Sequence, residues 1–184
     1  MYKRQIYNTG SDAANTMVRA FLTKIGESYL NHSFNTGSGK GKEIWQGIKI
    51  KFESKCAFCG KEFNELTIEH LVMFNRKECG LHHPGNVVPS CKSCNKRTRD
   101  KESKEYVDWI KHLETKCDSS EEFEIRKEKI ISHINSENYP KLTEDEKNAL
   151  KAVAESLYER ISNELPKSID LFKKIDSTLV KGSK

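Results

Sequence analysis

The sequence contains no run of about 18 apolar residues, the length at which a transmembrane helix is expected. Its first segment, MYKRQIYNTGSDAANTMVRAF, lacks the apolar stretch and the small-residue cleavage site of a secretory signal. Apolar residues make up only 35% of the 184 residues, so the expected core is modest for the length. We therefore expect a cytoplasmic protein without membrane contact, folded as one domain or as one core with a helical appendage.

A strong excess of either charge is also missing from this chain. Charged residues make up 32% of the sequence, yet the net charge is only +5 and the pI is about 8.8. This balance weakly favours an anionic partner such as nucleic acid. A surplus of this size also occurs without any special cause.

The cysteines, by contrast, have an informative spacing. Four of them form two Cys-x-x-Cys pairs, at Cys56 and Cys59 and at Cys91 and Cys94. Without a secretion signal, such pairs indicate a metal site more readily than disulfides. Four thiolates around Zn²⁺ make a closed structural site that contributes on the order of 10 kcal/mol to folding. The alternatives are an iron centre in the same ligand set and two pairs of unrelated thiols. We expect reduced thiols at Cys79 and Cys117.

Apolar spacing predicts that most of the chain outside this region is helical. The predicted helices cover residues 11–31, residues 44–52 and the whole chain after Lys101, with a separate last helix over residues 169–179. Thr143 begins a capping box, a signal for the start of a helix. The Gly-, Ser- and Lys-rich segment 31–42 is predicted to be a loop.

Two short strands are expected in the centre of the chain. The segment ELTIEHLV, residues 65–72, is rich in β-branched and apolar residues, and NVVPS, residues 86–90, predicts a second strand that Pro89 restricts to an edge or an end. A helix capped by Ser90 is expected to follow. The predicted fold class is therefore mainly α with a small central strand, loop, strand and helix. The expected segments are 1–54, 55–101 and 102–184.

The centre also carries residues suited to phosphodiester hydrolysis. Glu69 and His70 lie near the end of the first predicted strand, Asn86 opens the second, and Asn95 follows the last paired cysteine. A neutral imidazole can activate water near pH 7. A divalent ion such as Mg²⁺ stabilises the charge that builds on the phosphate, and it takes hard oxygen ligands of the kind that Glu69 and Asn95 offer.

The lines CAFCGKEFNELTIEHLVMF and HHPGNVVPSCKSCNKRTRDK resemble the HNH endonucleases that carry a zinc-bound ββα-metal finger. The resemblance covers residues 55–101, which we call the finger, and does not extend to the flanking helices. It implies that His70 is the general base and that Glu69 and Asn95 bind a catalytic Mg²⁺ or Mn²⁺ ion. It further implies that Asn86 ties the loop to the strand that bears the base, and that the four paired cysteines hold structural zinc.

Position 69 departs from the family pattern, which usually has an Asp there. Glu is one methylene longer, so its carboxylate reaches the ion differently. Adjacent residues in a regular strand also face opposite ways, so Glu69 and His70 can serve one site only if the strand ends or bulges there. If Glu69 turns away, Asn75, His82 or His83 can substitute from the loop.

Cationic residues and loop histidines are the candidate nucleic-acid contacts of the finger. Phosphate contacts from such residues give salt-dependent affinity with little sequence information. The candidates are Arg76, His82, His83, Lys92, Lys96, Arg97 and Arg99. The alternative is an ordinary solvated helix face for the cations and solvated loop positions for the histidines.

Together these features predict a metal-dependent DNA endonuclease acting in restriction, phage defence or mobile-element processing. Its expected partners are double-stranded DNA, a second copy of the chain and a protein of a defence system. The alternatives are a non-catalytic zinc finger that binds nucleic acid or protein, and a nuclease toxin directed at RNA.

Overall fold

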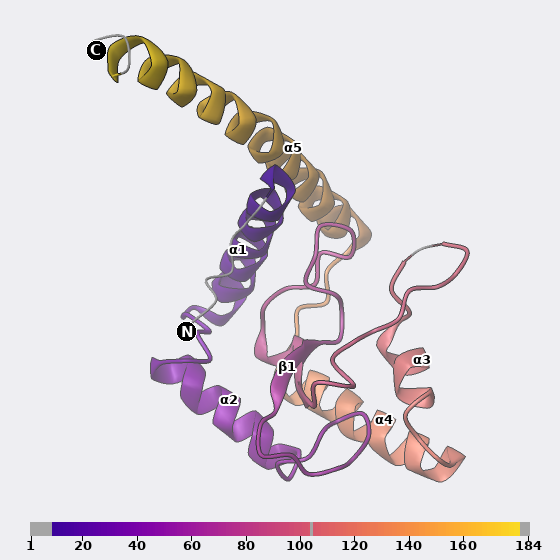
Figure 1. Cartoon of the computed structure of the whole chain (residues 1–184). Helices are drawn as coiled ribbons and strands as arrows, with labels where there is room; N and C mark the ends of the chain where they lie inside the picture. Colours follow the sequence, from indigo (N-terminus) through magenta and orange to yellow (C-terminus); the bar gives the residue numbers. More distant parts are fainter. Residues whose placement is uncertain (1–8, 104, 181–184) are drawn as a thin grey trace.

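The computed structural model describes residues 9–103 and 105–180 of the chain (Figure 1). Its elements are α1 (Gly10–Leu30), α2 (Gly39–Lys51), β1 (Thr67–His70), the 3-10 turn η1 (Pro84–Asn86), β2 (Val87–Ser90), α3 (Trp109–Glu114), α4 (Ser120–Ser136), α5 (Glu144–Ile175) and the π-helical turn η2 (Asp176–Val180). The prediction of a mainly helical chain with a small central sheet is confirmed. None of the described helices combines the length and apolar composition that crossing a membrane requires.

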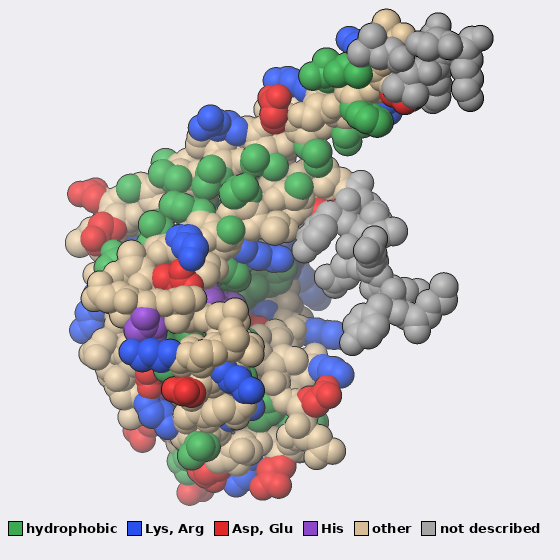
Figure 2. Space-filling model, turned by 90° about the vertical axis from the view of Figure 1, so that its left-hand side faces the viewer, with side chains coloured by type: hydrophobic (Ala, Val, Ile, Leu, Met, Phe, Trp, Pro, Cys, Tyr) green, Lys and Arg blue, Asp and Glu red, His purple; other side chains and the backbone are tan. Residues whose placement is uncertain are grey.

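The first and last long helices, α1 and α5, pack against each other (Figure 1). Val18 and Leu22 of α1 and Ala154 of α5 are fully buried in a hydrophobic cluster between the helices and the loop before β2. Thr143 caps α5 with the capping box that the sequence predicts. Among the described residues, the packing of α1 on α5 ends near Ser162, whose backbone lies against Gly10, and the rest of α5 extends away from the other labelled elements (Figures 1 and 2).

Two helix boundaries differ from the sequence predictions. Helix α5 continues through Pro166 to Ile175, so the prediction of a separate last helix is wrong. Proline in a helix interior removes one backbone hydrogen bond, but it does not change the register of the apolar stripe on either side. Helix α2 begins at Gly39, several residues earlier than predicted, which shortens the loop after α1.

The central sheet consists of β1 and β2 in antiparallel register, with Thr67 opposite Ser90 and His70 opposite Val87. Each strand of a two-stranded sheet has a free edge, which is why Pro89 is tolerated inside β2. The Pro89 carbonyl accepts a hydrogen bond of 2.8 Å from the Ala57 amide, so the free edge of β2 holds the first cysteine turn.

The helix that the sequence predicts to begin at Ser90 is absent, and that prediction is wrong. Residues 91–95 form a turn and a bend, and residues 96–100 have no helix before α3 begins at Trp109. The side chains of Asn95 and Arg97 hydrogen-bond to β1, and these contacts hold the segment across the strand in an extended path. The structure therefore contains two strands and the cysteine cluster, without the helical part of a ββα unit.

The main hydrophobic core surrounds this sheet. Val87 and Val88 of β2 are fully buried against residues from before and after the finger. The flanking side chains in this core include Phe34, Trp45, Ile48, Phe52, Leu113 and Ile130. One core therefore contains residues from all three expected segments, which fixes the finger against α2, α3 and α4.

Candidate functional site

The four paired cysteines come together at one point beside the sheet. The sulfur atoms of Cys56, Cys59, Cys91 and Cys94 all lie within 4.8 Å of one another, and three of the four residues are buried. Zinc–sulfur bonds of about 2.3 Å in a tetrahedron place sulfurs about 3.8 Å apart. The Sγ atoms of Cys59 and Cys91 are 4.0 Å apart. The cluster is therefore compatible with one structural zinc ion, as the spacing predicts.

The two cysteine pairs adopt the same local turn. The Gly60 amide donates to the Cys56 carbonyl at 2.9 Å, and the Asn95 amide donates to the Cys91 carbonyl at the same distance. Gly60 has φ of +68°, a conformation that glycine adopts without a steric penalty. Each turn brings its two sulfurs to one side, which is the arrangement that a shared ion requires.

Crowding shifts the ionisation of Cys59, Cys91 and Cys94 in different directions. Burial opposes ionisation of Cys91, but hydrogen bonds from Ser93 and Cys94 lower its pKa to about 6. Burial and the neighbouring Cys56 thiolate raise the pKa of Cys94. Burial likewise raises the pKa of Cys59. Such opposed shifts follow because adjacent thiolates repel one another, and a bound cation removes that repulsion.

His70 lies at the end of β1 and is held on two sides. Its Nε2 lies 3.0 Å from Nδ1 of His82, and its ring stacks on Phe74 with centroids 4.6 Å apart. The Nε2 of His82 lies 3.1 Å from the Phe34 carbonyl, which can only accept a hydrogen bond. The neutral His82 ring therefore accepts at Nδ1 from His70 Nε2–H, which leaves Nδ1 of a neutral His70 without a proton.

The surroundings of His70 keep its ring neutral. Burial is the main cause, and repulsion by a protonated His82 ring, by Arg19 and by Arg97 adds to it, so the pKa of His70 falls to about 3. Burial also lowers the pKa of His82, despite its hydrogen bond to the Phe34 carbonyl. Both rings are therefore neutral at pH 7, the protonation state in which a histidine can take up a proton.

Glu69 makes a buried ion pair with Arg97. The Oε1 atom of Glu69 lies 2.7 Å from Nη2 of Arg97, and Arg97 also donates to the backbone carbonyls of His70 and Leu71. Burial raises the pKa of Glu69, although the guanidinium opposes this shift. Because β1 ends at His70, both neighbours line one hollow of about 370 Å³ together with Arg19 and Phe74. We call this space the His70 hollow.

The two asparagines of the motif hold opposite ends of β1. Asn86 is buried: its Oδ1 accepts from the Val72 amide at 2.7 Å, and its Nδ2 donates to the Val72 and Leu81 carbonyls at 2.9 Å. The Nδ2 of Asn95 donates to Thr67 Oγ1 and to the Ile68 carbonyl. Thr67 and His70 are three residues apart, or about 10 Å along a strand. Asn86 thus fixes the loop after the His70 end, and Asn95 fixes the other end.

Three of the residues expected to contact nucleic acid are exposed. Lys92 makes only an exposed ion pair with Glu65 at 3.5 Å, and Lys96 lies free on the surface of the described chain. The guanidinium of Arg99 stacks over the ring of Tyr106 at 4.2 Å. These three side chains are accessible to a phosphate backbone.

The other four expected contacts are buried or already engaged by other side chains or backbone groups. His83 is fully buried and accepts a hydrogen bond from the Gly85 amide, and Arg97 is engaged by Glu69. His82 is taken up by His70 and the Phe34 carbonyl. Arg76 is half-buried, pairs with Glu155 at 3.0 Å and lies over the Tyr158 ring. Burial of His83 and Arg97 corrects the expectation that these two side chains face a ligand.

Arg19 and Phe74 are site residues that sequence reasoning did not identify. Arg19 belongs to α1, far before the motif in sequence, and its polar side chain on a helix has no distinguishing pattern. Phe74 follows β1 in the loop, where an aromatic residue usually indicates core packing. Only the packing of α1 against the loop brings Arg19 to the His70 hollow.

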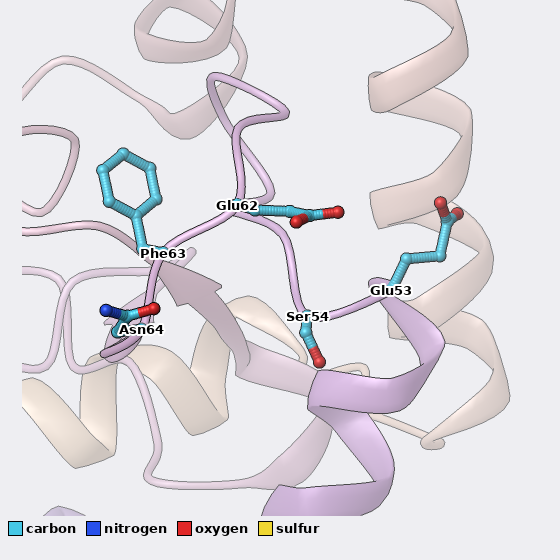
Figure 3. A pocket seen from close by; sticks show the side chains of 5 residues that line it. All are labelled: Glu53, Ser54, Glu62, Phe63 and Asn64. Carbon is cyan, nitrogen blue, oxygen red and sulfur yellow. The ribbon is translucent and has the colours of Figure 1, made fainter.

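A separate hollow of about 490 Å³ lies between the end of α2 and the loop at residues 62–64 (Figure 3). Figure 3 shows the carboxylates of Glu53 and Glu62 extending on one side and Phe63 on the other. Hydrogen bonds from Lys129 and then Lys55 lower the pKa of Glu53 to about 2. This hollow shares no lining residue with the His70 hollow.

Comparisons with protein-family models, with curated proteins and with solved structures find no match for this chain. The resemblance to HNH endonucleases therefore depends on the motif residues alone.

Proposed function

We propose that this chain is a zinc-stabilised, metal-dependent DNA endonuclease in which His70 is the general base. The observation that supports this most strongly is the hydrogen-bonded chain from His70 through His82 to the Phe34 carbonyl. That chain leaves Nδ1 as the proton acceptor of a neutral imidazole at the edge of a hollow that also contains Arg19 and Glu69. If His70 and His82 served only to pack the core, a hollow beside the His70 ring would not be needed.

In the proposed reaction, Nδ1 of His70 takes a proton from water. The water oxygen forms a bond to the phosphorus atom, the bond from phosphorus to the leaving sugar oxygen breaks, and the leaving oxygen takes a proton from solvent. Arg19 supplies positive charge to the phosphate in the same hollow. Phe74 holds the imidazole plane by stacking. Positioning of this kind and proton transfer each contribute to the rate.

The oxygen atoms for a divalent ion are limited but present. Glu69 uses Oε1 for Arg97, so its Oε2 has no hydrogen-bond partner among the described residues and is the protein oxygen available at the His70 hollow. Asn95 holds the other end of β1 and does not line this hollow. Mg²⁺ usually takes only one or two protein oxygens and keeps several waters. Such an ion would stabilise the charge on the phosphate and the leaving oxygen.

The partners and the biological setting extend this proposal. A single hydrolytic centre cuts one strand, so double-strand cleavage requires a second copy or a second event. Exposed apolar residues on the projecting part of α5 support a second copy as partner: Leu165, Ile169 and Phe172 are 36%, 46% and 67% exposed. Restriction, phage defence with a partner protein, and mobile-element processing are the settings that fit such an enzyme.

A non-catalytic zinc module that binds nucleic acid is the second candidate. The Glu69–Arg97 pair favours it, because the carboxylate expected to bind the catalytic ion already has a cationic partner. A pure binder would keep its zinc and its affinity for nucleic acid, and it would not need the free Nδ1 atom of His70.

The experiment is nicking of supercoiled plasmid by the zinc-loaded full chain with Mg²⁺ or Mn²⁺. We expect His70→Ala to abolish nicking while retaining zinc and the thermal unfolding midpoint. His32→Ala, which removes a histidine outside the finger, is the matched control and should nick like the wild type. Equal nicking by wild type and His70→Ala would exclude His70 as the base, and RNA of the same sequence in parallel separates the RNA-directed alternative.

A further inference from the structure

A second, larger hollow adjoins the His70 hollow and is lined by α1, α5 and two loops. Its volume is about 630 Å³, and its walls come from α1, the loop at residues 75–78, the first half of α5, and Arg99, Glu105 and Tyr106. Arg19 lines both hollows, so the two spaces meet at this side chain. We call the larger one the cationic groove.

Five cationic and three acidic side chains line the cationic groove. Of the acidic ones, Glu155 is paired with Arg76, and Glu78 accepts a hydrogen bond from the Met73 amide. By contrast, Arg19, Lys77 and Lys151 make no ion pair with any described residue, although the described chain contains many such pairs. Among the described residues, the groove therefore offers three cations that are not engaged in an ion pair, although Glu78 and Glu105 also line it.

Arg19 and Lys151 come from helices that pack against each other, so their backbones are fixed. Val18, directly before Arg19 in α1, and Ala154, three residues after Lys151 in α5, are fully buried. Long cationic side chains on a rigid scaffold suit the repeated phosphates of a nucleic-acid strand, because phosphate contacts need charge at fixed intervals rather than a fitted pocket.

We infer that one strand of nucleic acid reaches the His70 hollow along the cationic groove, with Arg19, Lys77 and Lys151 as its phosphate contacts. The choice of ligand rests on the proposed nuclease function. The flanking helices α1 and α5 thereby form part of the substrate site, and Arg19 contacts the backbone beside the phosphate that is cut. Arg76 and Glu155 close one wall of the groove as an ion pair.

The test measures DNA binding by fluorescence anisotropy, using the zinc-loaded full chain, a labelled 20-base-pair duplex and the matching single strand, without added Mg²⁺ or Mn²⁺. The variants are Arg19→Gln and Lys151→Gln. Lys24→Gln on α1 and Lys167→Gln on α5 are matched controls, since both lysines are exposed and outside the groove. Each groove substitution should weaken binding and reduce the salt slope of log K by about 1, while the controls keep the wild-type slope.

Equal salt slopes for the groove variants and the controls would overturn the inference. If the groove variants have a reduced salt slope of log K but the wild type does not cut DNA with Mg²⁺ or Mn²⁺, the groove binds DNA and the nuclease proposal is wrong. If the wild type cuts DNA in a His70-dependent way and the groove variants bind DNA like the controls, the nuclease proposal is supported and the inference about the cationic groove is wrong.

Discussion

Glu69 and Arg97 form a buried ion pair, with Oε1 and Nη2 separated by 2.7 Å, that joins the end of β1 to the segment after the second cysteine pair. Their side chains are 8% and 1% exposed, respectively. Arg97 also donates to two backbone carbonyls next to the His70 ring. The pair therefore holds the two chain segments of the finger together at the site.

Removal of one member of this pair leaves a buried charge without a partner. We expect Arg97→Gln to lower the free energy of unfolding by about 3–5 kcal/mol, because an unpaired carboxylate remains in the protein. Urea denaturation measures this change. Lys92→Gln, which breaks an exposed ion pair, should cost less than about 1 kcal/mol. Equal, small effects of both substitutions would show that Arg97 does not stabilise the fold.

The zinc site should be required for the central fold. We expect one zinc ion per chain by mass spectrometry of metals, and loss of this ion together with cooperative unfolding of the finger in Cys94→Ser. The physical reason is that structural zinc contributes on the order of 10 kcal/mol at neutral pH. Cys117→Ser is the matched control, because Cys117 lies outside the cluster. Full zinc content in Cys94→Ser would contradict a four-cysteine site.

The buried His83 should make stability depend on pH. Burial lowers the pKa of His83 to about 4, against an ordinary value of 6.5, and its Nδ1 accepts a hydrogen bond from the Gly85 amide. Because the folded pKa is depressed, the unfolded chain binds more protons between pH 4 and 6.5. The contribution of neutral His83 to the free energy of unfolding is therefore fully present above pH 6.5 and is lost as the pH falls from 6.5 to 4.

His83→Asn tests that pH dependence, because the Asn side chain can accept the same hydrogen bond without titrating. Between pH 4 and 6.5, the unfolding free energy of the wild type should fall more steeply than that of the variant, by up to about 1.4 kcal/mol per pH unit. Urea denaturation at several pH values gives both slopes. The zinc thiolates are common to both proteins, so parallel curves would mean that His83 does not titrate on unfolding.

The parts of the site that depend on short-range spacing could be predicted from the sequence. Each Cys-x-x-Cys pair specifies its own turn, and β1 and β2 come from apolar, β-branched segments. Residues 91–101 contain no Gly or Pro, the residues that interrupt helices, and this composition predicts a helix after Ser90. It does not form, since contacts of Asn95 and Arg97 with β1 override local propensity.

The roles of individual polar side chains could not be predicted in the same way. Arg97 and Arg99 look alike in the sequence, yet Arg97 is buried against Glu69 and Arg99 is exposed over Tyr106. The participation of His82 in the hydrogen-bonded chain, and of Arg19 in the hollow, depends on how α1 and the Phe34 segment pack. Such contacts join residues distant in sequence, and hydrophobic periodicity carries no information about them.

The most direct test of the nuclease proposal is the single-turnover cleavage rate of a labelled DNA duplex at saturating zinc-loaded protein with Mg²⁺ or Mn²⁺. Saturation removes differences in binding, so the rate reports the chemical step. We predict that His70→Ala lowers this rate by about 10²–10⁴-fold, the usual contribution of general acid–base catalysis, and that His32→Ala leaves it unchanged. The same rate in the wild type and in His70→Ala, or no cleavage by the wild type with either ion, would contradict the proposal.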